Sequence, residues 1–126
     1  MPVGLATICI KNLRLRTYIG FNPDEREKQQ DIVINVEMRY DADQAIESDN
    51  VEQAVDYKVI TKAIIQHVET HRFLLLEKLV GDVLSICSEP SAIQHASVTV
   101  DKPHALRFAD SVSLTMHYSK SPNQQG

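Results

Sequence analysis

Stretches that alternate between apolar and polar residues lie in both halves of the chain, and this period of two is typical of β-strands. In one of them Ile32 and Ile34 share a face, whereas Asn35 and Glu37 share the other. Four such stretches predict four strands, at residues 6–18, 32–40, 96–101 and 111–118. In the first stretch the apolar positions change parity near Lys11-Asn12, which predicts a β-bulge.

The middle of the chain follows a helical period instead. Ile60, Ile64 and Val68 recur every four residues, and a second apolar series with the spacing i, i+3, i+4, i+7 begins at Leu76. Both series predict amphipathic helices, at residues 57–70 and 75–88. The order ββααββ predicts an α+β domain, an antiparallel four-stranded sheet with two helices on one face. The other face is unusually polar, which water or a wet oligomer lumen explains better than a second core layer.

Composition narrows the class of protein. The chain has 126 residues, which predicts a single domain at residues 1–120 and a disordered polar tail at residues 121–126. The net charge of −4 argues against a nucleic-acid partner. No segment resembles a signal peptide or a membrane span, so we expect a cytoplasmic protein without a membrane partner. Cys9 and Cys87 lie far apart in apolar stretches, and both are predicted to be reduced core thiols.

Lys102 is the first candidate for chemistry. It closes the third predicted strand, and Pro103 follows directly, so the strand should end there because proline donates no ladder hydrogen bond. A lysine fixed at a strand end beside an ordered turn can act as an acid or a base if its surroundings are dry. The alternative is a solvated surface lysine.

Three further residues have a functional and an ordinary interpretation. Glu77 lies in the first turn of the second helix, where a carboxylate is favoured and can accept two parallel hydrogen bonds from an amidine-like edge. First-turn charge bias is the alternative. Tyr57 opens the first helix after Val55 and can bind a ligand or simply cover the core. Glu25 lies in an acidic segment, residues 24–28, predicted to be a mobile loop or a solvated charge run.

Basic residues suggest an anion site, whereas no metal site is predicted. Arginine pairs with phosphate oxygens in a fork geometry, so a basic rim for a polyphosphate is one interpretation, and solvated charges are the other. The residues of this rim are Lys11, Arg14, Arg16 and Arg107. His67 and His71 are spaced i, i+4 but lack a third ligand in register.

In combination, several segments resemble the dihydroneopterin aldolase family in identity and order. They are Ile19-Gly20 with Glu25, Val55-Asp56-Tyr57, Phe73-Leu74-Leu75-Leu76-Glu77 and Val100-Asp101-Lys102-Pro103. The resemblance covers residues 8–118 and implies the tunnelling fold. It also implies a homo-oligomer, an octamer of two stacked tetramers around a polar tunnel, with sites at subunit interfaces.

Other segments resemble one branch of this family, the epimerases that act on dihydroneopterin triphosphate. These segments are residues 10–20, 64–69 and 104–113. The segment His104-Ala105-Leu106-Arg107 stands where aldolases usually have a glycine-containing turn. The resemblance implies epimerisation at C2′ of 7,8-dihydroneopterin 3′-triphosphate to the monapterin epimer, with possible aldolase side activity. The alternatives are a dihydroneopterin aldolase of folate biosynthesis that releases glycolaldehyde, and a non-catalytic pterin-binding ring protein.

The resemblance also implies roles for individual residues. Lys102 is the general acid/base, Glu25 tunes it, and Glu77 with the Leu76 backbone holds the pterin ring. Tyr57 comes from a neighbouring subunit as a catalytic and substrate-binding residue. No metal or organic cofactor is required. The remaining substrate-binding residues are Val55, His104 and Arg107.

Overall fold

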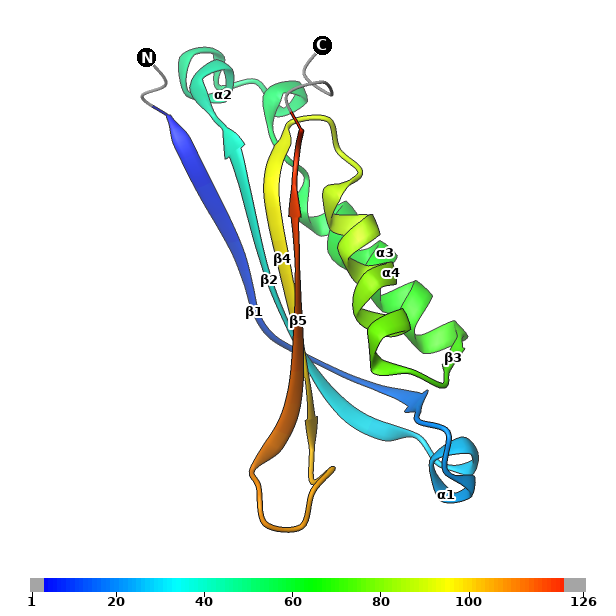
Figure 1. Ribbon diagram of the computed structural model, residues 1–126. Coiled ribbons are helices and arrows are strands. Elements are labelled where there is room, and N and C mark those ends of the chain that lie inside the picture. Colours follow the sequence, from blue (N-terminus) through cyan, green and yellow to red (C-terminus); the bar gives the residue numbers. More distant parts are fainter. Residues whose placement is uncertain (1–3, 122–126) are drawn as a thin grey trace.

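The computed structural model describes residues 4–121, and these form one layer of sheet with two long helices on one face (Figure 1). The α+β class and the order of the predicted elements are confirmed. The predicted tail lies outside the described residues except for Ser121. The predicted elements are present as β1 (Leu5–Ile19), β2 (Gln30–Asp41), α3 (Tyr57–Thr70), α4 (Leu76–Ser88), β4 (Ile93–Pro103) and β5 (Ser111–Ser119).

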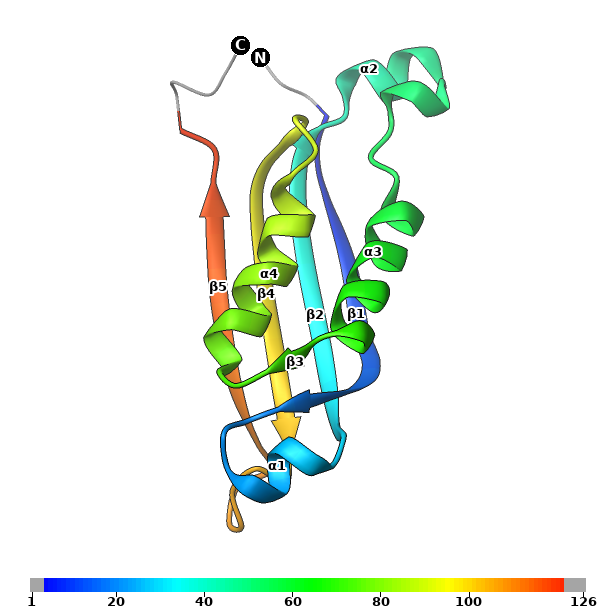
Figure 2. The same cartoon turned by 90° about the vertical axis from the view of Figure 1, so that its right-hand side faces the viewer.

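The sheet has a fifth strand that the sequence pattern did not predict. β3 (Arg72–Phe73) pairs in parallel with the end of β1, and the order across the sheet is β3-β1-β2-β4-β5. The other four strands are antiparallel, as predicted. A strand of two residues is too short to show an alternation. Figure 2 shows β3 between the end of α3 and the start of α4, so this short pairing fixes where α4 begins.

The predicted bulge in β1 is present. The β1–β2 register shifts between Ile10 and Leu13, Asn12 has a φ of 54°, and its backbone N–H donates to Asn35 Oδ1 at 2.9 Å. Residues with even numbers face the helices before the bulge, and residues with odd numbers face them after it. The bulge therefore decides which β1 side chains reach the open face of the sheet.

One cysteine prediction is wrong. Cys87 is buried in α4, and burial raises the pKa of its thiol to about 12. Cys9 is exposed because it lies before the bulge in β1, where odd-numbered residues face away from the helices. The apolar residues on either side of Cys9 are the ones that pack toward the core.

The core lies between the helices and one face of the sheet. The period-four residues of α3 and the apolar stripe of α4 are buried against the inward positions of β2 and β4. Thr17 is the only buried polar residue among residues 4–121, and its hydroxyl donates to the Val68 carbonyl at 2.7 Å. The fully buried side chains include Ile32, Ile34, Met38, Ile64, Val68, Leu79, Val80, Val83 and Val98.

A charged cluster joins the two long helices. His67 Nε2 lies 2.8 Å from Asp82 Oδ2, and Lys78 Nζ lies 2.9 Å from Asp82 Oδ1. Burial raises the pKa of Asp82, but the hydrogen bonds from Lys78 and His67 outweigh it, so the pKa is lowered. This pairing of His67 with a carboxylate was not predicted, because its partner lies on the other helix. Within the described part of the chain, no three His, Cys, Asp or Glu side chains are placed to hold a metal ion.

Three short helices complete the fold, and one of them corrects a prediction. The acidic segment expected to be a mobile loop contains α1 (Pro23–Glu27). Proline is favoured in a first turn because its φ suits a helix and its missing N–H needs no partner there. A helix of five residues is too short to show a helical period. The other two are α2 (Asp43–Ser48) and η1 (Val51–Gln53).

Candidate active site

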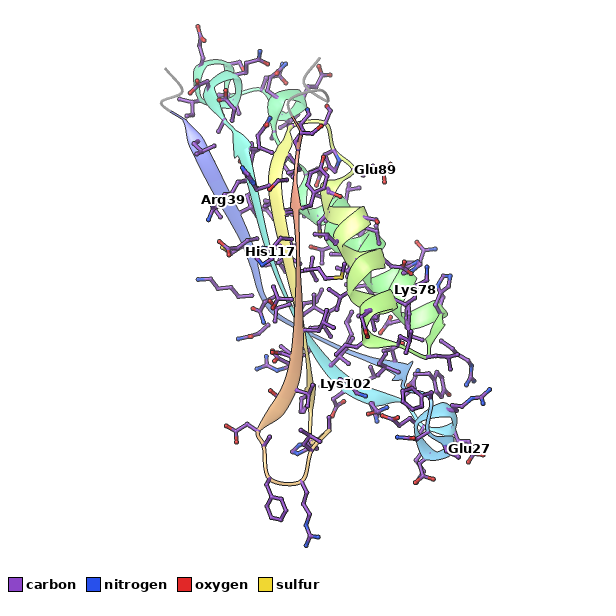
Figure 3. The ribbon with its side chains drawn as sticks, in the orientation of Figure 1. Glu27, Arg39, Lys78, Glu89, Lys102 and His117 are labelled. Carbon is purple, nitrogen blue, oxygen red and sulfur yellow. The ribbon has the colours of Figure 1, made fainter. Side chains whose placement is uncertain are left out.

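Lys102 lies near the end of β4, on the side of the strand that faces the helices. Its side chain is 13% exposed, and its Nζ donates to Glu25 Oε2 at 2.9 Å. Figure 3 shows Lys102 at the lower end of the sheet, toward the part of the fold that carries Glu27 and α1. Lys102 is therefore not a solvated surface lysine, because it is largely covered and paired with a carboxylate.

Glu25 is held in place from several directions. Its Oε1 accepts the backbone N–H of Asn22 at 3.4 Å, and the Gln30 side chain also donates to the carboxylate. The hydrogen bond from Lys102 lowers the pKa of Glu25, and this outweighs the opposing effect of burial. Gln30 also donates to the Ile19 carbonyl, so one side chain links β1, β2 and Glu25. Nothing in the sequence pattern around Gln30 indicates this role.

Gly20 leaves the space that Glu25 occupies. Its φ of 126° lies in a region that residues with a side chain rarely adopt, and a Cβ at this position would overlap the Glu25 carboxylate. Its backbone N–H donates to the Phe73 carbonyl at 2.9 Å, which ties the end of β1 to β3. Glycine is therefore required here for the carboxylate to reach Lys102.

The lowered pKa of Glu25 predicts a pH-dependent contribution to stability. A carboxyl group with a depressed folded-state pKa contributes stability that is fully present above its unfolded value of 4.5 and is lost as the pH falls through the folded value. Glu25→Gln should therefore be less stable than wild type at pH 7, and the difference should shrink below pH 4.5. Urea unfolding at a fixed protein concentration between pH 7 and pH 3 measures this.

Glu27→Gln is the matched control, since Glu27 is an exposed carboxylate on the same short helix. Its unfolding free energy should follow that of wild type across the whole pH range. A stability difference for Glu25→Gln that is the same at pH 7 and pH 3 would contradict the assigned role of the Lys102 hydrogen bond.

Glu77 lies at the same end of the sheet as Lys102. β3 holds the start of α4 beside the end of β1, and this places Leu76 and Glu77 in the first turn of the helix there (Figure 2). Glu77 is exposed and makes no ion pair within residues 4–121. The residue before the helix, Leu75, supplies no side-chain cap. Lys78 donates its N–H to the Leu75 carbonyl at 3.2 Å, so the N–H groups of Leu76 and Glu77 are the first-turn donors that remain open to a ligand. The turn thus offers a carboxylate and backbone donors together.

Tyr57 and Val55 lie at the opposite end of the domain. Tyr57 begins α3, whose last turn leads into β3, and a helix of 14 residues is about 20 Å long. Asp56 caps this helix by accepting the backbone N–H of Lys58 and Val59, both at 3.1 Å. Tyr57 is 52% exposed, whereas Val55 is buried. One chain therefore does not bring Tyr57 to Lys102.

His104 and Arg107 lie in the turn between β4 and β5, at the Lys102 end. His104 has a φ of 64°, in the left-handed region, and both side chains are exposed. The Arg107 guanidinium stacks over the Phe108 ring at 5.5 Å, and Phe108 is 95% exposed. The turn projects beyond the sheet (Figure 1).

These positions can be compared with known proteins. The family model "FolB: Dihydroneopterin aldolase" matches residues 8–117. The chain belongs to the dihydroneopterin aldolase family. The predicted family membership is confirmed, and the match spans every segment on which that prediction was based.

Two relatives in the dihydroneopterin aldolase family are described as dihydroneopterin triphosphate 2′-epimerases. The protein from Escherichia coli K12 is 53% identical over 120 residues, which cover 95% of this chain and all of the relative. The protein from Pseudomonas aeruginosa PAO1 is 50% identical over 113 residues, covering 90% of this chain and 92% of the relative. The resemblance to the epimerase branch is therefore confirmed.

A solved structure in the dihydroneopterin aldolase family confirms the fold. The crystal structure of E. coli dihydroneopterin aldolase in complex with neopterin superposes with a TM-score of 0.84 at 26% identity. The superposition covers 90% of this chain and 99% of that one. Within residues 4–121, no helix is both long and apolar enough to cross a membrane.

Proposed function

We propose that the protein epimerises 7,8-dihydroneopterin 3′-triphosphate at C2′, giving 7,8-dihydromonapterin 3′-triphosphate. The supporting observation is the covered Lys102–Glu25 pair, a proton-transfer group held at the end of the sheet beside the first turn of α4. It occurs in a chain that is half identical to two epimerases over most of its length.

The ring and the reacting side chain of the substrate have separate contacts in this proposal. Glu77 accepts two parallel hydrogen bonds from the aminopyrimidinone edge, and the Leu76 backbone N–H adds a donor. Lys102 then lies near N5 and the side-chain hydroxyls of the pterin. Glu25 holds the amine in position through its 2.9 Å hydrogen bond. His104 and Arg107, in the turn beyond the sheet, contact the remainder of the substrate.

The chemistry is a reversible carbon–carbon cleavage. Lys102 removes the proton of the 2′-hydroxyl as the C1′–C2′ bond breaks. The electron pair of that bond forms a C1′=C6 double bond, C6=N5 becomes a single bond, and N5 takes up the proton from Lys102. The products are an enol-like pterin and an aldehyde. If the aldehyde presents its other face before it adds back, C2′ is inverted, and the protons return in reverse order. The dihydropterin ring accepts the electrons, so Lys102 acts by proton transfer and forms no covalent adduct.

A second chain completes the site in this proposal. Tyr57 and Val55 lie about 20 Å along α3 from the end of the domain that carries Lys102. They reach a pterin at Lys102 only from a neighbouring subunit, so the active form is a homo-oligomer with sites at subunit interfaces. We propose an octamer of two stacked tetramers.

The second candidate function is aldolase activity, which the family model favours by its description. In that reaction the aldehyde leaves as glycolaldehyde instead of adding back. Both reactions share the same bond cleavage, so the same Lys102–Glu25 pair serves either of them.

Product analysis distinguishes these functions. With dihydroneopterin triphosphate as substrate, we expect the monapterin epimer to accumulate until it reaches equilibrium with the substrate, as measured by chiral chromatography of the pterins. Glycolaldehyde released from free dihydroneopterin, with no epimer formed from the triphosphate, would instead assign the protein as an aldolase. Absence of turnover with both substrates would point to a non-catalytic pterin-binding ring protein.

A further inference from the structure

The sheet divides at the end that carries Lys102. The β2–β4 ladder stops at Val33↔Asp101, whereas β1–β2 pairing continues to Gln30 and β4–β5 pairing continues to Pro103. Figure 1 shows the two strand pairs diverging below this point. We call the opening between them the fork. Because the sheet is open there, its helix-covered face and its polar face meet at the fork.

A hollow in the fork is lined by basic side chains from both sides of the opening. Arg14 and Arg16 lie on β1, and His104 directly follows the last residue of β4. After the bulge in β1, the even-numbered arginines point to the open face. The hollow's other lining residues are Leu15, Asp31, Ile32, Val33 and Pro103.

The two arginines of the fork differ in their partners. Arg16 Nε pairs with Asp31 Oδ1 at 3.1 Å, and a second guanidinium nitrogen donates to the Gln29 carbonyl at 3.2 Å. Arg14 has no ion-pair partner within the described part of the chain. The Asp31 carboxylate is therefore offset by Arg16, and the charge of Arg14 remains available for an anion.

The backbone of His104 contributes to this arrangement. A φ of 64° is uncommon for a residue with a side chain and costs conformational energy. It occurs immediately after Pro103, at the last pair of the β4–β5 ladder. The chain turns sharply there, and His104 lines the hollow two residues after Lys102. Backbone conformations of this kind cluster at ligand-binding and active sites, so this one favours a functional role for the turn.

We propose that the fork binds the phosphate chain of the substrate, with Arg14 as the principal contact and His104 as a second donor. This inference rests on the proposed function and deepens it. Arginine binds phosphate oxygens in a two-pronged geometry. The phosphates begin at C3′, one carbon from the reacting C2′. The phosphate chain of a substrate bound at Lys102 therefore begins close to the fork, where His104 lies two residues after Lys102.

The site explains how epimerisation prevails over cleavage. After the C1′–C2′ bond breaks, the phosphates remain on the aldehyde fragment. Arg14 then holds that fragment while its carbonyl presents the other face, which is a positioning effect. The fragment from unphosphorylated dihydroneopterin lacks this anchor and escapes. Arg107, exposed at the tip of the turn over Phe108, lies outside the lining of the hollow.

Arg14→Gln tests the proposal with two readouts. The KM for dihydroneopterin triphosphate should rise about 10- to 100-fold, the usual effect of losing a charge-assisted hydrogen bond. The ratio of cleaved product to epimer from the triphosphate should also increase. Turnover of unphosphorylated dihydroneopterin should stay unchanged. Equal effects on both substrates, or no effect on either, would overturn the assignment.

Arg39→Gln is the matched control, since Arg39 is also an exposed arginine on the open face of the sheet but lies far from the fork (Figure 3). It should behave as wild type with both substrates. Arg107→Gln distinguishes the fork from the tip of the turn. A larger rise in the KM for the triphosphate with Arg107→Gln than with Arg14→Gln would place the phosphate site on the turn and reject the fork.

Binding of inorganic tripolyphosphate tests the phosphate site without requiring turnover, so it can be judged separately from the proposed function. It should raise the melting temperature of wild type and of Arg39→Gln, and that rise should be lost in Arg14→Gln. Wild type that turns over neither pterin would contradict the proposed function, while a tripolyphosphate shift lost in Arg14→Gln would still support the anion site. Epimerisation by wild type together with an undiminished shift in Arg14→Gln would reject the fork alone.

Discussion

Lys102→Met should lower turnover of dihydroneopterin triphosphate by about 10²- to 10⁴-fold, the usual contribution of a positioned proton-transfer group. Methionine keeps a long, flexible apolar side chain but removes the amine that donates to Glu25 at 2.9 Å. The pterin would still bind through Glu77, so kcat should fall far more than KM rises. Single-turnover measurements of epimer formation would isolate the chemical step.

The stability of this variant needs its own control. Lys102→Met leaves the partly covered Glu25 carboxylate without its cation, and an unpaired charge of this kind is destabilising. The double variant Lys102→Met/Glu25→Gln removes both charges and should unfold closer to wild type while staying inactive. Lys62→Met, on the exposed side of α3, should retain full turnover. Full turnover by Lys102→Met would show that a group other than Lys102 transfers the proton.

Local sequence signals predicted the regular elements of this fold well. The helix predicted to begin at Tyr57 begins there, because Asp56 caps it and an apolar residue recurs on every turn. The bulge at Asn12 was predicted because one inserted residue reverses the parity of every later position in the strand. Such signals are contained within a few residues, and a single sequence displays them.

Features that depend on distant contacts were not predicted. The hydrogen bond between Glu25 and Lys102 joins residues 77 positions apart, and the sequence related these two residues to each other only through family resemblance. The fork depends on where the β2–β4 ladder stops, which is set by the twist of the sheet and the bend in β1. For the same reason, the sequence grouped Arg107 with Arg14 and Arg16, whereas the hollow combines the latter two with His104.

Tyr57→Ala and Lys102→Met should each be inactive alone but should regain activity when they are assembled together. Lys102 and Tyr57 lie at opposite ends of one chain, so each proposed site takes Lys102 from one subunit and Tyr57 from the next. In a random equal mixture about a quarter of the sites contain both intact residues. Co-expression with two affinity tags, followed by turnover measurements on doubly purified oligomers, would quantify this recovery.

The pairing of Lys102→Met with Glu25→Gln provides the decisive control. Lys102 and Glu25 meet within one chain, so no mixture of these two variants contains a site in which both are intact. That mixture should show no more activity than the average of its parents. Recovery with Tyr57→Ala but not with Glu25→Gln can arise only if the site is shared between subunits. If Tyr57→Ala is inactive and neither mixture recovers, then the site is not shared between subunits. If Tyr57→Ala alone is fully active, then the tyrosine has no part in the site.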